Sequence, residues 1–202
     1  MITHCRMADE VPEDSSVEDK VDPTVEYVQK LGPDHLELIF SASEWVFPLS
    51  PSAGLDIFTA DREEVERLPR HAVSNHLAKI APKEQYAKYL EHIIHHLNEN
   101  GPEFHERLIE IYMVRIKQSK SGSTETEKED EDVRQAQEED YQKLIRFLGS
   151  STQYRPDRLL ARIGDDERME EVKATLLGKL GQHEGALQIY VHKLKDHARA
   201  EE

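Results

Sequence analysis

The chain has 202 residues and a formal net charge of -15, with 41 Asp and Glu against 26 Lys and Arg. This acidic balance argues against nucleic-acid binding, which relies on clustered Lys and Arg, and no apolar run approaches the roughly 20 residues of a membrane-spanning helix. The single cysteine, Cys5, permits no disulfide within the chain, and with no signal-peptide core at the N-terminus the sequence predicts a soluble, cytoplasmic protein.

The composition favours an all-α fold. Charged residues make up 33% of the chain and apolar residues 37%, as is typical of helical arrays in which much of each helix stays in water. The chain has only nine glycines and lacks the alternating runs of Val, Ile and Thr that predict strands. We therefore predict an α-solenoid, a stack of helical hairpins that bury one another's apolar faces.

The first 21 residues predict a disordered acidic tail, because they contain many carboxylates and few hydrophobic residues. Asp22-Pro23 then predicts a helix start, with an N-cap residue followed by proline at the first helical position. Gly32 is expected to end this helix. The helix that starts at Asp22-Pro23 is the first of the predicted block of solenoid helices, residues 22–118.

Prolines divide the rest of this block into further helices. A short helix is expected over 51–58, a connector with one helical turn over 59–68, and another helix from Pro69. The helix expected over 33–48 has two apolar sides, which predicts burial between neighbouring helices. Those sides consist of Leu36, Ile39 and Phe40, and of Leu38, Ala42 and Trp45.

The clearest amphipathic helix follows Pro82. Its hydrophobic residues recur at i, i+3, i+4, i+7, i+8 and i+11, namely Tyr86, Tyr89, Leu90, Ile93, Ile94 and Leu97. A helix after Pro102 carries two apolar stripes, which predicts that it is also covered on both sides. These stripes are Phe104, Leu108, Ile111 and Tyr112, and Ile109, Met113 and Ile116.

Residues 119–139 predict an acidic, flexible insert, because Val133 and Ala136 are their only hydrophobic residues and little surface could be buried to offset the ordering entropy. A solvated loop is the main interpretation, and an acidic docking segment for a basic partner is the alternative. Solenoid helices are expected to resume over 140–202. The pattern continues to the last residue, which suggests that the solenoid is truncated at the C-terminus.

The stretch Thr175–Asp196 reads as two short helices joined by a tight turn. Gly181 stands where a left-handed residue would end the first helix, and small residues on both helices predict a close approach. The order small, Leu, polar, Ile, aromatic occurs both at 54–58 and at 186–190. This repetition favours a helical repeat protein.

His92 and His96 are the clearest metal candidates, because they stand one helical turn apart. The sequence places no third ligand beside them, so both are expected to face water, as are His71 and His76; a small helical metalloprotein is the weaker alternative. No nucleophile elbow, phosphate-binding glycine loop or kinase signature occurs. We predict no catalytic residues, no metal and no cofactor, and a structural core that includes Trp45, Leu55, Phe58, Leu90, Ile94, Leu108, Leu177, Leu187 and Tyr190.

Three separated blocks of sequence carry a family resemblance. They are LELIFSASEWVFPLSPSAGLDIFTADREEVERLPR, YLEHIIHHLNENGPEFHERLIEIYM and LLGKLGQHEGALQIYVHKLKDHARAEE. In this order they resemble the vacuolar protein sorting 39 family, a subunit of the HOPS tethering complex, and its relatives such as the TGF-β-receptor-associated protein. The resemblance covers residues 22–202 apart from the acidic insert.

The resemblance implies a fragment of an α-solenoid of clathrin heavy-chain-like repeats, with no established catalytic residues. It implies a scaffold role in tethering late endosomes to vacuoles or lysosomes, as a peripheral protein on those membranes in vesicle-mediated transport and autophagy. The implied partners are other tether subunits, above all a vacuolar sorting 11-type subunit, and a Rab7-type GTPase through the full-length protein. The alternative is a regulator that binds, or exchanges nucleotide on, a Rab7-type or Rag-type GTPase.

Overall fold

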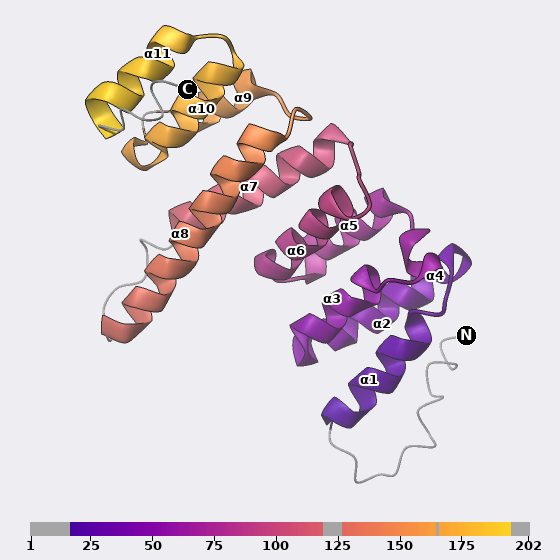
Figure 1. The fold of residues 1–202 in the computed structure, drawn as a ribbon. Coiled ribbons are helices and arrows are strands. Elements are labelled where there is room, and N and C mark those ends of the chain that lie inside the picture. Colours follow the sequence, from indigo (N-terminus) through magenta and orange to yellow (C-terminus); the bar gives the residue numbers. More distant parts are fainter. Residues whose placement is uncertain (1–16, 119–126, 165, 195–202) are drawn as a thin grey trace. The chain divides into compact units, whose positions relative to one another are not determined.

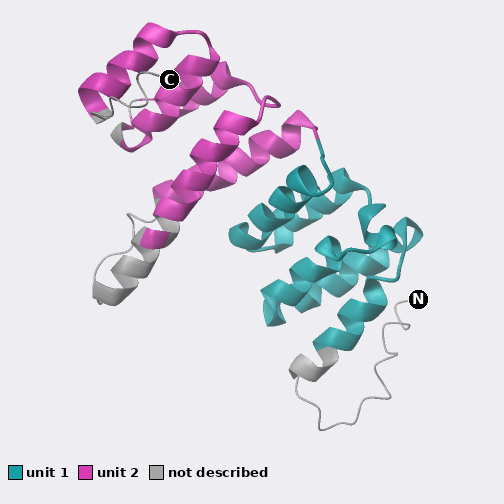
Figure 2. Ribbon diagram, viewed as in Figure 1, with its two compact units in different colours: residues 1–99 teal, residues 100–202 magenta. Residues whose placement is uncertain are grey.

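The computed structural model describes residues 17–118, 127–164 and 166–194, and these fold into eleven α-helices and three short helical turns (Figure 1). The described ranges contain no strand, which confirms the predicted all-α class. The chain divides into two compact units, one up to Glu99 and one from Asn100 onward (Figure 2). Each unit is built from helices that pack in hairpins.

Unit 1 is organised around the hairpin of α2 (Leu36–Leu49) and α3 (Pro51–Thr59). Helix α1 (Val17–Val28) packs against both of them, and the 3-10 turn η1 (Pro33–His35) leads into α2. The single-turn helix α4 (Glu63–Glu66) follows, and then α5 (Arg70–Ile80) and α6 (Lys83–His95), which pack together while α6 also contacts α3. The most deeply buried large side chains of this unit are Ile39, Ile57, Leu77, Leu90 and Ile93.

Unit 2 opens with α7 (Pro102–Gln118), which packs against α8 (Glu127–Ser150). Helix α9 (Pro156–Ile163) and the turn η2 (Glu167–Met169) lead to α10 (Glu170–Lys179), which contacts α8, α9 and α11 (His183–Gln188). The chain then continues as a π-helix, η3 (Ile189–Leu194). The deepest side chains of unit 2 are Phe104, Leu108, Ile109, Leu144, Leu148, Met169 and Leu176, each of which contributes about 1.5–3 kcal/mol by its burial.

The first helix begins earlier than the sequence predicted. Helix α1 starts at Val17, so Pro23 lies inside it and residues 17–21 are helical rather than part of a disordered tail. Val21 is 3% exposed and shares its face with Val25 and Val28, so the apolar stripe begins before the proline. Its burial stabilises a turn that the many acidic residues around it made look disordered. The rest of the predicted tail, 1–16, lies outside the described residues.

The predicted acidic insert was partly wrong for the same kind of reason. Helix α8 starts at Glu127, so 127–139 is helical; 119–126 lies outside the described residues. The C-terminal half of α8 is anchored by buried Leu144 and Leu148. Once that anchor exists, Glu, Lys and Gln extend the helix at little cost because they are good helix formers.

Close approach within the α2–α3 hairpin depends on one glycine. Gly54 of α3 is buried against the ring of Phe47, and a Cβ built on Gly54 would lie 2.7 Å from Phe47 Cγ. The hydroxyl oxygen of Ser50 accepts a hydrogen bond from the Ala53 N–H at 3.4 Å and caps α3, which Pro51 opens. The second hairpin turns as predicted, since Gly181 has a φ of 73°.

Candidate interaction surfaces

Two serine–histidine pairs are the arrangements that most resemble a nucleophile and its base. Ser43 Oγ lies 2.9 Å from His76 Nε2, and His105 Nδ1 lies 2.8 Å from Ser151 Oγ. Ser43 is 0% exposed and donates its one proton to the Phe40 carbonyl oxygen at 2.8 Å. The His76 Nε2–H therefore donates to Ser43. A buried hydroxyl whose proton is already engaged joins helices and offers no nucleophile to a substrate.

His76 is not the surface residue that the sequence predicted. Its ring stacks on Phe40 with centroids 4.0 Å apart and planes inclined by 6°, and it also contacts Phe58. Burial lowers the pKa of His76 below its ordinary value of 6.5, which favours the neutral ring that this packing requires. The residue joins α5 to α2 and α3.

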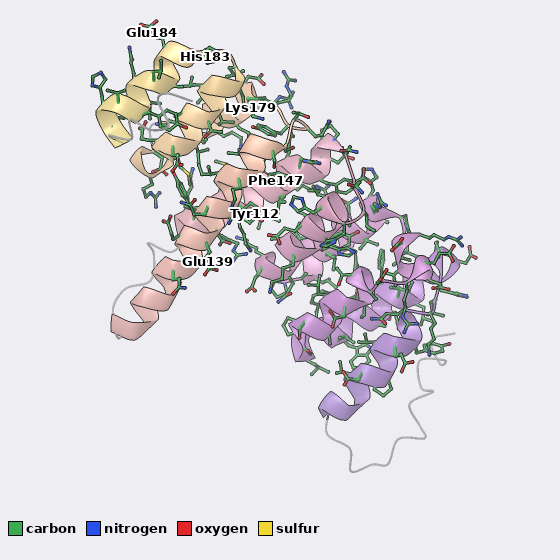
Figure 3. The ribbon with its side chains drawn as sticks, viewed as in Figure 1. Tyr112, Glu139, Phe147, Lys179, His183 and Glu184 are labelled. Carbon is green, nitrogen blue, oxygen red and sulfur yellow. The ribbon has the colours of Figure 1, made fainter. Side chains whose placement is uncertain are left out.

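The second pair has an equivalent role in unit 2. His105 and Ser151 are both buried, and the ring of His105 stacks on Phe147 with centroids 5.4 Å apart. Phe147 lies on α8 (Figure 3), and Ser151 follows the end of that helix. The Tyr154 hydroxyl donates to the Leu148 carbonyl oxygen at 2.8 Å. These contacts hold the α8–α9 connection against α7.

The candidate metal pair consists of two rings stacked on each other. The centroids of His92 and His96 are 5.2 Å apart, and burial together with His96 lowers the pKa of His92. In the described part of the chain, no three His, Cys, Asp or Glu side chains gather as ligands for a metal ion.

The residues predicted to form the core divide into three groups. Phe58, Leu90, Ile94 and Leu108 are at most 7% exposed. Leu55, Leu177 and Tyr190 are half-buried. The prediction was wrong for Trp45, which is 39% exposed, and for Leu187, which is 43% exposed. Each side chain is partly exposed to water, although the apolar pattern of its helix predicted burial.

The hairpin of α10 and α11 is attached to α8 through a lysine. Lys179 Nζ donates to the Gly149 carbonyl oxygen at 2.7 Å and to the Ser151 carbonyl oxygen at 3.3 Å. These carbonyls stand at the C-terminal end of α8, where a cation also favours the helix dipole. His183 and Glu184 follow Lys179 in the chain and lie at the exposed start of α11 (Figure 3).

A buried carboxylate holds the last turn of the described chain. Glu170 is 5% exposed, and its Oε1 accepts from Lys193 Nζ at 2.8 Å and from Lys173 Nζ at 3.2 Å. Burial opposes ionisation of Glu170, but these two lysines outweigh it and hold the pKa below its ordinary value. The π-helix η3, which contains Lys193, is thereby joined to α10. The i, i+3 spacing of Glu170 and Lys173 could have been noticed, but the contact with Lys193, 23 residues further on, could not be found from local spacing.

Unit 1 exposes three large hydrophobic side chains on its first two helices. Tyr27 of α1 is 61% exposed, and Trp45 and Leu49 of α2 are 39% and 49% exposed. Trp45 and Leu49 lie one helical turn apart on the same side of α2. Sequence reasoning missed this surface because it assigned Trp45 to a buried side.

The arrangement defines a class of protein, an array of helical hairpins whose polar clusters join helices and which exposes single large hydrophobic side chains on its helices. No helix among the described ones is both long and apolar enough to cross a bilayer. No family profile matches the chain, and no solved structure matches it.

The sequence does match known proteins. Over 185 residues it is 43% identical to the mouse Vam6/Vps39-like protein, covering 89% of this chain and 21% of that protein. It is 37% identical over 199 residues to the Caenorhabditis elegans vacuolar protein sorting-associated protein 39 homolog, covering 94% of this chain and 21% of that protein. It is 32% identical over 170 residues to human transforming growth factor-beta receptor-associated protein 1, covering 82% of this chain and 18% of that protein. The chain is therefore homologous to a segment of the Vam6/Vps39-like proteins, and it spans about a fifth of their length.

Proposed function

We propose that this chain is a non-catalytic scaffold segment of a HOPS-type tethering subunit that acts in vacuolar or lysosomal protein sorting. The observation that carries the proposal is its homology, over most of its length, to proteins named for vacuolar protein sorting. The packing agrees with it, because the serine–histidine pairs and the Glu170 cluster join helices inside each unit.

The mechanism is geometric. Hairpins that bury one another's faces form a stiff support, and the energy of that support comes from packing between neighbouring helices. In the full-length protein such a support keeps binding regions apart, on the cytoplasmic side of the late endosome or vacuole membrane. The expected partners are other tether subunits, of which a vacuolar sorting 11-type subunit comes first, and a Rab7-type GTPase.

A segment exchange tests the proposal. The corresponding part of the human Vam6/Vps39-like protein is replaced by this chain in cells that lack the protein, and delivery of endocytosed cargo to lysosomes is measured. We expect delivery to be restored. Leu108→Asp, which places a charge in the core, should abolish it, whereas Leu187→Asp on an exposed position should not. Failure of a chimera that is expressed at the normal level would overturn the proposal.

A nucleotide-release assay separates the scaffold from the regulator. The purified chain is added in sub-stoichiometric amounts to Rab7-type and Rag-type GTPases loaded with a fluorescent nucleotide. A scaffold leaves the release rate unchanged. Release stimulated by the wild-type chain but not by Leu108→Asp would replace the scaffold proposal with an exchange activity.

A further inference from the structure

The exposed surface of α1 and α2 in unit 1 combines aromatic side chains with carboxylates. Tyr27, Trp45 and Leu49 expose more of their side chains than the other large hydrophobic residues of this unit's described part. Half-buried Leu38 lies seven residues before Trp45, on the same side of α2. Leu38, Trp45 and Leu49 therefore form a strip along one side of α2, whereas Tyr27 stands on α1, which packs against α2. Exposed Trp and Tyr residues are the residue types that most often anchor a protein partner.

The charge around these residues is almost entirely negative. Between Val21 and Ala60 the chain has only two exposed basic side chains, His35 and Lys30, and Lys30 pairs with Glu26 at 2.9 Å. The exposed carboxylates in this stretch are Asp22, Glu26, Asp34, Glu37, Glu44 and Asp56. Glu37 and Glu44 are seven residues apart on α2 and so line the side of the helix next to Trp45. A partner here meets apolar anchors bordered by carboxylates.

We propose that this surface binds a basic amphipathic helix of another protein. The apolar side of such a helix covers Trp45 and Leu49, and its Lys and Arg side chains pair with Glu37 and Glu44. A Lys or Arg placed over the indole of Trp45 adds a cation–π contact. The inference concerns unit 1 alone and does not depend on the tethering role.

The charges decide against the other occupants. An anionic membrane surface would be repelled by the carboxylates beside Trp45. A second copy of this chain that met the same surface would bring Glu37 and Glu44 against their own counterparts, because a two-fold interface is self-complementary. The carboxylates that repel an anionic membrane and a second copy of this chain attract a basic partner.

The only tryptophan of the chain lies in this surface, so its fluorescence reports binding directly. The probe is an 18-residue acetylated peptide with Leu on one side of the helix and Lys on the other, titrated into the full 202-residue chain. Controls are a scrambled peptide of identical composition and a peptide with Glu in place of Lys. We expect a saturable blue shift of Trp45 emission with the first peptide only, weakened by added salt.

Variants are compared by fluorescence anisotropy of a labelled peptide, so that Trp45 can be removed. Trp45→Ala should weaken binding about tenfold or more, and Glu37→Lys and Glu44→Lys about two- to fivefold each with a reduced salt dependence. Leu187→Ala, an equally exposed position in unit 2, should leave binding unchanged.

Four results would overturn the proposal. They are absence of saturable binding, equal binding of the scrambled peptide, full affinity in the Trp45→Ala or charge-reversed variants, and a blue shift with phosphatidylserine vesicles or with rising protein concentration alone. The last result would assign the surface to a membrane or to a second copy.

Discussion

Replacing Gly54 by alanine tests the close packing of the α2–α3 hairpin. In an ordinary helix interior, Gly→Ala increases stability by about 0.5–1 kcal/mol, because alanine is the better helix former. At Gly54 the new Cβ would lie 2.7 Å from Phe47 Cγ and 2.9 Å from both Phe47 Cδ atoms. These atoms are close to the backbone end of a side chain that is only 3% exposed, so the ring cannot simply rotate away.

The expected magnitude follows from the two opposing effects. Overpacking of a core costs about 1–3 kcal/mol, which exceeds the gain in helix propensity, so Gly54→Ala should lower the free energy of unfolding by about 1–2 kcal/mol. Gly178 of α10 is the matched control, because no atom lies within 4 Å of a Cβ built there. Gly178→Ala should instead raise the free energy of unfolding by up to about 1 kcal/mol.

Urea unfolding measures both variants. Trp45 fluorescence reports unit 1, and circular dichroism at the helical band reports the whole chain. In a Phe47→Leu background the penalty of Gly54→Ala should shrink or change sign, since the two positions are in direct contact. A Gly54→Ala protein as stable as the wild type, or a penalty that Phe47→Leu leaves unchanged, would refute the packing described.

Three further predictions concern burial and ionisation. Leu108→Ala should cost about 2–5 kcal/mol because Leu108 is 0% exposed, whereas Leu187→Ala should cost less than about 1 kcal/mol; equal urea midpoints would contradict this difference. The hydrogen-bonded, buried hydroxyl of Tyr154 has its pKa raised from 10.0 to about 12, so the unfolded chain loses this proton first and stability should fall as the pH rises from 10 to 12. Tyr154→Phe should lessen that fall in alkaline urea titrations. Burial lowers the pKa of His76 below 6.5, so the unfolded chain takes up this proton first and unit 1 should lose stability as the pH falls below 6.5. His76→Phe keeps the stack on Phe40 and should flatten the pH dependence of the urea midpoint measured by Trp45 fluorescence. A variant whose midpoint falls with pH as steeply as that of the wild type would contradict this account of His76.

The helices themselves could be predicted, because their signals are local. Apolar residues at helical spacing identified the buried stripes of α6 and α7, and proline or glycine marked many of the boundaries. Leu97, predicted to continue the stripe of α6, lies beyond the end of that helix and is half-buried. The connector turn around Val65 and Leu68 was also correct, since Val65 lies in α4, Leu68 follows it, and both are buried. The left-handed Gly181 was expected from its place in the turn.

The outcome at Trp45 and Leu187 could not be predicted from the same signals. Periodicity shows that a helix has an apolar side, but whether a neighbour covers that side depends on where the next helices pack. Helix α2 has two apolar sides: on one, Ile39 is buried and Leu36 and Phe40 are half-buried, and on the other Ala42 is buried but Trp45 is exposed. Trp45, where the core prediction failed, is the centre of the proposed partner surface.

At both acidic stretches the amino-acid composition predicted disorder where the structure has helix. Val21 and residues 127–139 stand among carboxylates, and a charge-rich stretch resembles a disordered one. What made them helical was attachment to a buried segment further along the chain. The serine–histidine pairs were missed for a related reason, because Ser43 and His76 are 33 residues apart and His105 and Ser151 are 46 residues apart.

Lys179 has a practical consequence for anyone who shortens this protein. Its ammonium group closes the end of α8 by hydrogen bonds to the carbonyls of Gly149 and Ser151, about thirty residues earlier in the chain. A fragment cut in the loop after α8 would retain that helix but lose its C-terminal cap, leaving two carbonyls to water. Truncations of the second unit should therefore retain α10, and acetylation of this one lysine would weaken the same junction without removing a residue.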